Sequence, residues 1–258
     1  MNEAVAKMQF DRVNVQIYRS GSELGDAAAK QAGTVISEAI EDHGMARIIV
    51  GTGNSQQNLI DSLVRMSELE WDRVEVFHMD EYVGLPADHP ASFRRYMHEK
   101  LVDRVLPASF HGIAGDAADV EQECRDYAEL LAANPADLCC MGIGENGHLA
   151  FNDPPDARFN DPQPVKLVRL AEASRRQQVG EGFFESLADV PEYAITLTIP
   201  ALLSAKRALV IVPEARKAQA VRAALQGPIS PACPASVLRH YNHVRLMLDR
   251  DSASLLDA

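Results

Sequence analysis

The sequence is poor in positive charge and contains no long apolar run. It has 25 Lys and Arg against 37 Asp and Glu, which gives a formal net charge of −12 at pH 7. Nucleic acids and anionic membranes are bound by basic surfaces, so we expect neither as a partner. No stretch approaches the ~18 apolar residues of a membrane-spanning helix, and the first residues lack the apolar segment of a signal peptide. These absences predict a cytoplasmic protein.

Cysteine is also scarce, and its spacing excludes the common metal motifs. The four cysteines, Cys124, Cys139, Cys140 and Cys233, form neither a C-x-x-C pair nor a Cys/His ligand set. We therefore expect reduced thiols, no metal and no cofactor. Cys139 and Cys140 are adjacent in an apolar run that has strand character, so they should face opposite sides of a strand and serve as packing residues.

The chain is long and apolar enough to bury a sizeable core. It has 258 residues, of which 47% are hydrophobic, and we expect a single domain over residues 1–258. Apolar runs with strand character alternate with amphipathic segments, which predicts an α/β fold: a three-layer α/β/α sandwich with a mostly parallel, modified Rossmann-like sheet. The expected strands are 13–18, 46–50, 74–79, 137–143, 193–199, 208–212 and 244–248, and the expected helices are 22–43, 55–69, 91–103, 118–134, 200–204, 214–226 and 234–239.

A polar segment that contains several Pro, Asn and Asp residues, about 154–184, separates two of these expected strands. Such an insertion beside a site is either a lid or an excursion over the surface. The sequence does not determine the oligomeric state, and a homo-oligomer is compatible with it.

A histidine block follows the apolar run that ends at Ile143. It contains Gly144, Asn146, His148 and Asp153, so a histidine and an acid lie beside a glycine-rich turn. Open α/β sheets bind ligands just past the carboxyl ends of their strands, which is where His148 is expected. The alternative is a histidine that merely satisfies hydrogen bonds in a tight turn.

An acid pair, Asp80 and Glu81, comes shortly after the strand-like alternation Val74-Glu75-Val76. Successive side chains of an extended chain point to opposite sides, so at most one of the two acids should face a pocket. The other would then cap the segment that follows. A purely structural role for both is the alternative reading.

A glycine loop follows the expected strand 46–50 and precedes a helix. It comprises Gly51, Thr52, Gly53, Asn54 and Ser55. Free backbone N–H groups and the helix dipole make such a junction suitable for an anion. The loop lacks the G-K-[ST] of a P-loop and the third glycine of a dinucleotide fingerprint, so it suits a compact sugar phosphate better than a nucleotide.

Together these stretches resemble the glucosamine-6-phosphate deaminase (isomerase) family. The resemblance lies in MDEYVGLP from Met79 to Pro86, His89-Pro90 after it, Gly142-Ile143-Gly144, and Gly147-His148-x-Ala150-Phe151-Asn152. Weaker similarity extends it over roughly residues 46–250. The related 6-phosphogluconolactonases share the fold and a Gly-His block, but they carry Asp-Glu-Arg where this chain has Asp80-Glu81-Tyr82.

The resemblance implies an enzyme that converts an amino-sugar 6-phosphate to a ketose 6-phosphate and ammonia, without metal or cofactor. His148 would open the sugar ring, because a histidine can both accept and donate protons near neutral pH. Asp80 would be the base that carries a proton from C2 to C1. Lys217 and the glycine loop would bind the phosphate, and Glu81 and Gly144 would also contact substrate.

Two departures from the resembled family stand out. Well-studied members have aspartate at the position of Asn146 and glutamate at that of Asp153, both acting with the histidine in ring opening. If Asn146 lies against the imidazole, its amide can orient the ring but cannot stabilise a positive charge as a carboxylate would. The resemblance implies that segment 154–184 is a lid over the site. The family's lid arginine falls near Gly182, which leaves Arg175 and Arg176 as the nearby substitutes for binding phosphate.

These departures leave three classes of function open. The first is an amino-sugar-phosphate deaminase. The second is another sugar-phosphate enzyme, such as a galactosamine-6-phosphate isomerase or a 6-phosphogluconolactonase, and the third is a catalytically silent sugar-phosphate sensor. A sensor needs an attached partner or DNA-binding module, and the chain has no basic helix-turn-helix region. The positions around Lys166 and Ser174 do not clearly match the residues that respond to N-acetylglucosamine 6-phosphate, so we expect no such control.

Overall fold

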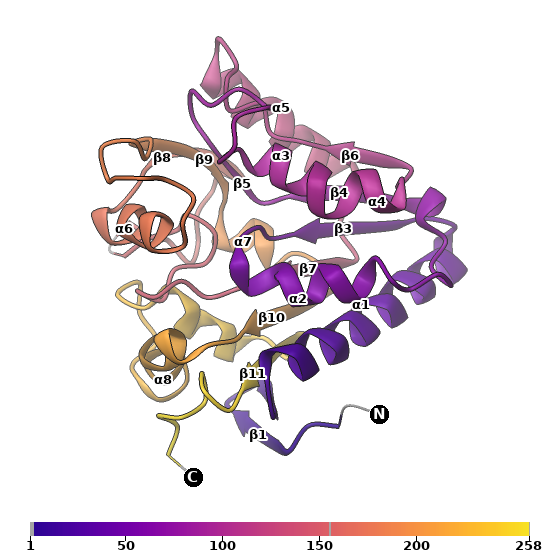
Figure 1. Cartoon of the computed structure of the whole chain (residues 1–258), viewed down its shortest axis with the longest axis vertical. Helices are drawn as coiled ribbons and strands as arrows, with labels where there is room; N and C mark the ends of the chain where they lie inside the picture. Colours follow the sequence, from indigo (N-terminus) through magenta and orange to yellow (C-terminus); the bar gives the residue numbers. More distant parts are fainter. Residues whose placement is uncertain (1–2, 155, 258) are drawn as a thin grey trace.

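A central sheet of eight strands organises the chain (Figure 1). The structure is a computed structural model that describes residues 3–154 and 156–257. The strand order is β1-β2-β11-β10-β7-β3-β4-β6; β1 pairs antiparallel with β2, and all other neighbours are parallel. The strands are β1 Ala6–Phe10, β2 Val13–Tyr18, β3 Ala46–Val50, β4 Val74–His78, β6 Ser109–His111, β7 Leu138–Met141, β10 Arg207–Val212 and β11 Val244–Asp249.

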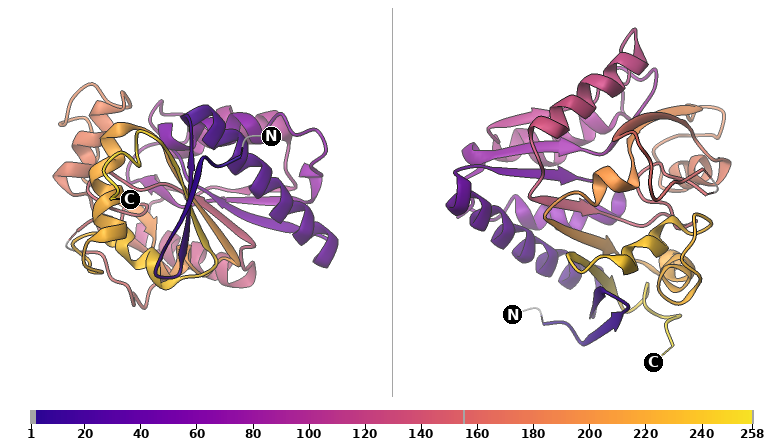
Figure 2. Two further views of the ribbon diagram at one scale, coloured as in Figure 1. Left: turned by 90° about the horizontal axis from the view of Figure 1, so that it is seen from below. Right: turned by 180° about the vertical axis from the view of Figure 1, so that it is seen from behind.

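Helices cover both faces of this sheet, as the sequence predicted. Figure 1 looks onto the face covered by α1 and α2, and the right panel of Figure 2 looks onto the opposite face, where α5 and α7 lie. The helices are α1 Gly21–His43, α2 Asn54–Leu63, α3 Phe93–Met97, α4 Asp103–Val105, α5 Val120–Ala133, α6 Glu172–Gly180, α7 Ile199–Leu202 and α8 Ala218–Gln226, with the short helices η1 Trp71–Arg73, η2 His98–Val102, η3 Ala215–Lys217 and η4 Pro234–His240.

Successive side chains of the parallel strands point to opposite faces of the sheet, and each face contributes to one half of the core. In β3, Ile48 and Val50 pack with α1 and α2, whereas Ile49 packs on the other face. In β7, Cys139 and Cys140 divide between the two faces in the same way, and both are buried. Near-continuous apolar runs are expected for strands that are covered on both sides. The prediction that the two adjacent cysteines face opposite sides is confirmed.

A second, antiparallel sheet lies beside the carboxyl ends of the main strands. It has the order β5-β9-β8, formed by Asp80–Tyr82, Tyr193–Leu197 and Val165–Arg169. The predicted strand 193–199 is therefore real but belongs to this sheet and not to the central one. The polar segment 154–184 contains β8 and α6, which were not predicted: both are short, and α6 is rich in polar residues. In Figure 1, α6 lies beyond the ends of the central strands.

Most other predicted elements agree with the structure within a few residues. Strands β1 and β6 were not predicted, and helix α2 ends at Leu63 rather than residue 69. The predicted helix 91–103 is present as α3, a π-helical turn and α4 in succession. Within the described residues, no helix is long and apolar enough to cross a membrane.

Because of His78, the last residue of β4, we expect the protein to become less stable at acidic pH. His78 is fully buried, and its Nε2 accepts a 2.7 Å hydrogen bond from the backbone N–H of Ile113, so the ring is neutral. Burial lowers the pKa of His78 to about 3, and the positive charge of Arg94 acts in the same direction. The unfolded chain binds this proton near pH 6.5, so the free energy of unfolding should fall as the pH drops below that value, by up to about 1.4 kcal/mol per pH unit.

Urea unfolding of the native protein and of His78→Gln between pH 7 and 4 measures this contribution. Glutamine can still accept the Ile113 N–H but does not titrate. The variant should be less stable at pH 7, and the stability gap should close as the pH falls. A gap that is constant over this range would show that His78 does not titrate between the two states.

Candidate functional site

Four parallel strands end around one pocket, at the point where β7 lies between β3 and β10. The segments that follow β3, β4, β7 and β10 all contribute to its walls, as does α6. This is the edge where open α/β sheets bind ligands. The pocket is lined by Gly51, Thr52, Gly53, Ser55, Met79, Asp80, Phe93, Gly142, Ile143, Gly144, His148, Ala150, Phe151, Gln177, Gln178, Glu181 and Lys217.

The glycine loop forms one end of the pocket. Gly53 has φ +94°, a conformation that side chains strongly disfavour, and it precedes the first residue of α2. Gln56 donates its backbone N–H to the Gly53 carbonyl at 3.1 Å, and Tyr96 Oη donates to the same carbonyl at 3.1 Å. The loop is thereby fixed with the start of α2 beside the pocket, which is the geometry that anions favour.

Lys217 is the buried cation on the same wall. It follows β10, and its exposed fraction is only 2%. The turn that presents it contains Glu214 at φ +82°, a strained conformation stabilised by hydrogen bonds from Glu214 N to both carboxylate oxygens of Asp249. Burial lowers the pKa of Lys217, while the nearby charge of Glu181 acts to raise it. A compact anion that entered this end would meet a positive charge with little competing water.

His148 is held by two side chains on its Nδ1 side. Its Nδ1 lies 3.1 Å from Asp153 Oδ1 and 3.0 Å from Ser174 Oγ. The same Asp153 oxygen accepts hydrogen bonds from Ser174 Oγ at 2.5 Å and from Asn146 Nδ2 at 2.9 Å. Burial acts to raise the pKa of Asp153, but the bonds from His148, Ser174 and Asn146 outweigh it and keep the pKa below its usual value. Asp153, one methylene shorter than glutamate, therefore still reaches the imidazole.

Asn146 has a different role from the one considered from the sequence. Its Nδ2 bonds to Asp153, and its Oδ1 accepts the backbone N–H of His148 at 3.1 Å. The amide thus orients the carboxylate and the loop backbone, and the imidazole is contacted by Asp153 and Ser174.

The ring of His148 packs flat against Gly144. A Cβ added to Gly144 would come within 2.1–2.3 Å of three ring atoms, so only glycine leaves room for the imidazole here. With Nδ1 directed to the carboxylate, a proton on that nitrogen leaves the Nε2 lone pair available to the pocket. A neighbouring strained residue, Ala150 at φ +49°, also lines the pocket.

Asp80 is a buried acid of the pocket wall. It begins β5, and its exposed fraction is 6%. Burial raises the pKa of Asp80 to about 8, and the adjacent charge of Glu81 contributes to the rise. A carboxyl group with such a pKa is a stronger base once ionised than an exposed aspartate, which suits it to remove a proton from carbon.

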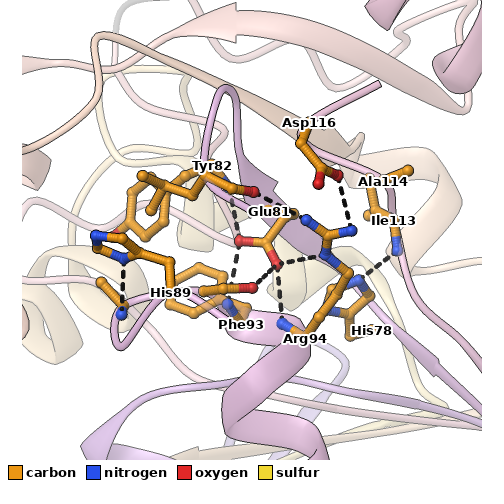
Figure 3. A network of polar contacts seen from close by, with 12 residues as sticks. His78, Glu81, Tyr82, His89, Phe93, Arg94, Ile113, Ala114 and Asp116 are labelled. Atoms are coloured by element: carbon orange, nitrogen blue, oxygen red, sulfur yellow. Dashed lines mark hydrogen bonds and ion pairs between the residues drawn. The ribbon is translucent and has the colours of Figure 1, made fainter. Parts of the chain in front are cut away.

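Glu81 does not line the pocket. Its carboxylate lies in the turn that starts α3 (Figure 3). Its carboxylate accepts backbone N–H groups from Tyr82, Phe93 and Arg94 at 2.9, 3.1 and 2.8 Å and the Ser92 hydroxyl at 2.8 Å. Arg94 Nε lies 3.4 Å from it. The expectation that Glu81 contacts substrate is therefore corrected: this acid anchors α3 to β5, which is the capping role that alternation of the acid pair allows.

The two arginines considered as phosphate ligands also lie elsewhere. Arg175 Nη2 donates to the carbonyls of Leu187 and Val190 at 2.7 and 2.8 Å. Arg176 is on the outer face of α6, where it pairs with Glu172 and 68% of its side chain is exposed. Neither lines the pocket. Both arginines are on α6, and a different face of this helix lines the pocket.

That inward face of α6 supplies residues that sequence reasoning did not assign to the site. Gln177 and Gln178 line the pocket, and Ser174 contacts His148. Glu181 caps the end of the helix; its carboxylate accepts from Gln177 Nε2 at 2.8 Å and lies 3.5 Å from Arg216 Nη2. Spacing of i, i+3, i+4 and i+7 could have revealed this polar face if the segment had been assigned as a helix.

Among the described residues, no group of three or more His, Cys, Asp or Glu side chains is placed to hold a metal ion. His148 and Asp153 are engaged with Ser174 and Asn146 as described above.

Comparison with known proteins agrees with this architecture. Residues 19–247 match the family model for glucosamine-6-phosphate isomerases/6-phosphogluconolactonase. A glucosamine-6-phosphate deaminase of Bacillus thuringiensis (strain Al Hakam) is 36% identical over 243 residues, 94% of this chain and 89% of the relative. The structure of a monomeric glucosamine-6-phosphate deaminase superposes with a TM-score of 0.87 at 31% identity, covering 96% of this chain and all of that one. A 6-phosphogluconolactonase from Shewanella baltica shares the fold, with a TM-score of 0.78 at 21% identity over 94% of this chain and all of that one.

The fold and the pocket define an α/β enzyme whose buried acid, histidine and lysine meet at the carboxyl edge of its central sheet. The chain belongs to the glucosamine-6-phosphate isomerase/6-phosphogluconolactonase family.

Proposed function

We propose that the protein is a glucosamine-6-phosphate deaminase, which converts glucosamine 6-phosphate and water to fructose 6-phosphate and ammonia. The proposal rests on one observation: Asp80 and His148 line the same pocket as Lys217 and the glycine loop. A base and a proton carrier are thus available for the reacting carbons, and a cation for the phosphate. The similarity to deaminases at 36% and 31% identity supports it.

His148 serves the first step, in which the pyranose ring opens. The proton of the anomeric hydroxyl must leave as the ring oxygen gains one, and the free Nε2 of His148 can accept the first and donate the second. Asp153 and Ser174 hold the ring from the Nδ1 side. Asp153 also stabilises the positive charge that the imidazole carries between the two transfers.

Asp80 serves the second step. Its carboxylate takes the proton from C2 and returns it to C1, so that the C2 amine becomes an imine. Water adds to this imine, the C2–N bond breaks, and ammonia leaves as the C2 ketone forms. The reaction is an internal redox isomerisation followed by hydrolysis of a C–N bond, and it balances without an external oxidant or reductant.

Incubation with glucosamine 6-phosphate and, separately, galactosamine 6-phosphate tests the proposal, with ammonia and ketose phosphate measured together. For whichever sugar reacts, ammonia and ketose phosphate are expected in equal amounts. Hydrolysis of 6-phosphogluconolactone without ammonia release from the amino sugars would instead assign the lactonase activity of the same family. Binding of sugar phosphates without any turnover would indicate a sensor.

Ser174 is proposed as a positioning residue for His148. Ser174→Ala removes the hydroxyl that contacts both Nδ1 and Asp153, and we expect kcat to fall about tenfold with little change in KM, the usual cost of one lost hydrogen bond. Ser174→Thr keeps the hydroxyl and should recover activity. An increase in KM without a fall in kcat in Ser174→Ala would contradict this positioning role.

Ser174 begins the face of α6 that is turned toward the pocket. We further propose that segment 154–184 acts as the lid of the pocket.

A further inference from the structure

Helix α6 presents one buried side chain whose hydrogen-bonding capacity is unused. Gln178 lines the pocket and its exposed fraction is 6%. Its Oε1 is buried and has no hydrogen-bond partner among the residues that the structure describes. An adjacent amide, that of Gln177, is by contrast bonded to both Glu145 N and Glu181. A buried amide oxygen without a partner costs free energy, so an unpaired one on a residue that lines a ligand pocket points to a donor supplied by the ligand.

The position of Gln178 along the helix indicates which part of a ligand it faces. Ser174, Gln178 and Glu181 are spaced i, i+4 and i+7 and share one face of α6. With a rise of about 1.5 Å per residue, Gln178 lies about 6 Å beyond Ser174 and about 4.5 Å before Glu181. Ser174 marks the His148 end of the pocket, and Glu181 marks the end formed by Gly53 and Lys217.

We propose that Gln178 binds the hydroxyl groups at the middle of the sugar, on C3 and C4, and is therefore the residue that distinguishes C4 epimers. The orientation rests on the proposed function: C1 and C2 lie at His148 and Asp80, and the C6 phosphate lies at Lys217. This leaves C3 and C4 opposite Gln178. The amide oxygen accepts a hydrogen bond from one hydroxyl, and the amide NH₂ can donate to its neighbour.

The test is the epimer preference of Gln178→Met, which nearly preserves the shape of the side chain and removes both polar groups. The ratio of kcat/KM for glucosamine 6-phosphate and galactosamine 6-phosphate should shrink by about tenfold, because a site built to bond a hydroxyl loses that discrimination with the bond. Ala173→Met places the same side chain on the exposed face of α6 and should leave the ratio unchanged.

Binding of ligands that do not react separates this inference from the proposed function. The affinities of glucose 6-phosphate and of its 3-deoxy and 4-deoxy derivatives are measured by calorimetry for the native protein and Gln178→Met. Loss of at least one of the two hydroxyls should weaken binding to the native protein about five- to tenfold and have little effect on the variant. That result supports the role of Gln178 even if no amino sugar releases ammonia.

Equal weakening of both proteins by both deoxy sugars would overturn the proposal. So would an unchanged epimer ratio in Gln178→Met, including the case in which the substitution lowers activity on both epimers by the same factor because α6 is disturbed.

Discussion

Asp80→Asn lowers kcat for ammonia release by at least ~100-fold, because the amide cannot take the proton from C2. The native enzyme should also show why this acid is suited to the task. Burial, with the charge of Glu81, raises the pKa of Asp80 to about 8, so kcat/KM should increase as the pH rises through that value and the carboxylate forms. Steady-state rates between pH 6 and 9 measure the loss of kcat in the variant and the rise of kcat/KM with pH in the native enzyme. The residual activity of Asp80→Asn should not show this rise.

The stability of Asp80→Asn separates a lost base from a damaged fold. Between the ordinary carboxyl pKa near 4 and the raised pKa near 8, the unfolded chain is ionised while the folded one holds the proton. The acid therefore opposes folding at neutral pH, and the variant should melt at an equal or higher temperature. Asp88→Asn, on the exposed part of the same segment, should leave the rate unchanged. Near-normal turnover by Asp80→Asn would assign the base to another residue.

Lys217→Ala raises KM for glucosamine 6-phosphate by about 10- to 100-fold, which is the range expected when hydrogen bonds to a charged group worth about 1.5–3 kcal/mol are lost. The phosphate keeps its charge during the reaction, so kcat should change much less. Inorganic phosphate, used as a competitive inhibitor, should weaken in parallel.

The matched control is Lys30→Ala, an exposed lysine of α1 whose loss should have no effect on either constant. Unphosphorylated glucosamine provides the second control, since Lys217→Ala should alter its turnover far less than that of the phosphorylated sugar. Equal losses on the two sugars would mean that Lys217 does not bind the phosphate.

Regular periodicity made the central sheet predictable from the sequence. Strands such as β3 and β10 are buried on both faces, so they appear as unbroken apolar runs, and the helices between them have clear amphipathic patterns. The same patterns located the ends of β3, β4 and β7, and hence Asp80 and His148 near the pocket, since parallel strands end at a common edge. Lys217, which also lines the pocket, was assigned from the family resemblance.

The contribution of α6 to the site could not be predicted, because it depends on how the helix packs in the folded protein and not on a local sequence pattern. The helix is short and strongly polar, and it packs over the pocket with Gln177, Gln178 and Glu181, where hydrophobic periodicity gives no information. The role of Glu81 was mistaken for a related reason. Its five hydrogen-bond and ion-pair donors come from the neighbouring Tyr82 and from residues 92–94, and their convergence depends on the fold of that turn.

Glu181 gives the phosphate end of the pocket a further property. Its carboxylate lies beside Arg216 and near Gly53, and its charge acts on Lys217. A phosphate bound beside Lys217 would lie near the Glu181 carboxylate, which already interacts with Arg216 and Lys217. The two negative charges would repel each other, and the repulsion is stronger in a buried site than in water. Gly180 and Gly182 flank the acid, and a Cβ added at either glycine would meet no atom within 4 Å. If the sugar phosphate binds beside Lys217 as proposed, it competes with the Glu181 carboxylate for the same cations, and the affinity for phosphate then depends on the difference between the two interactions.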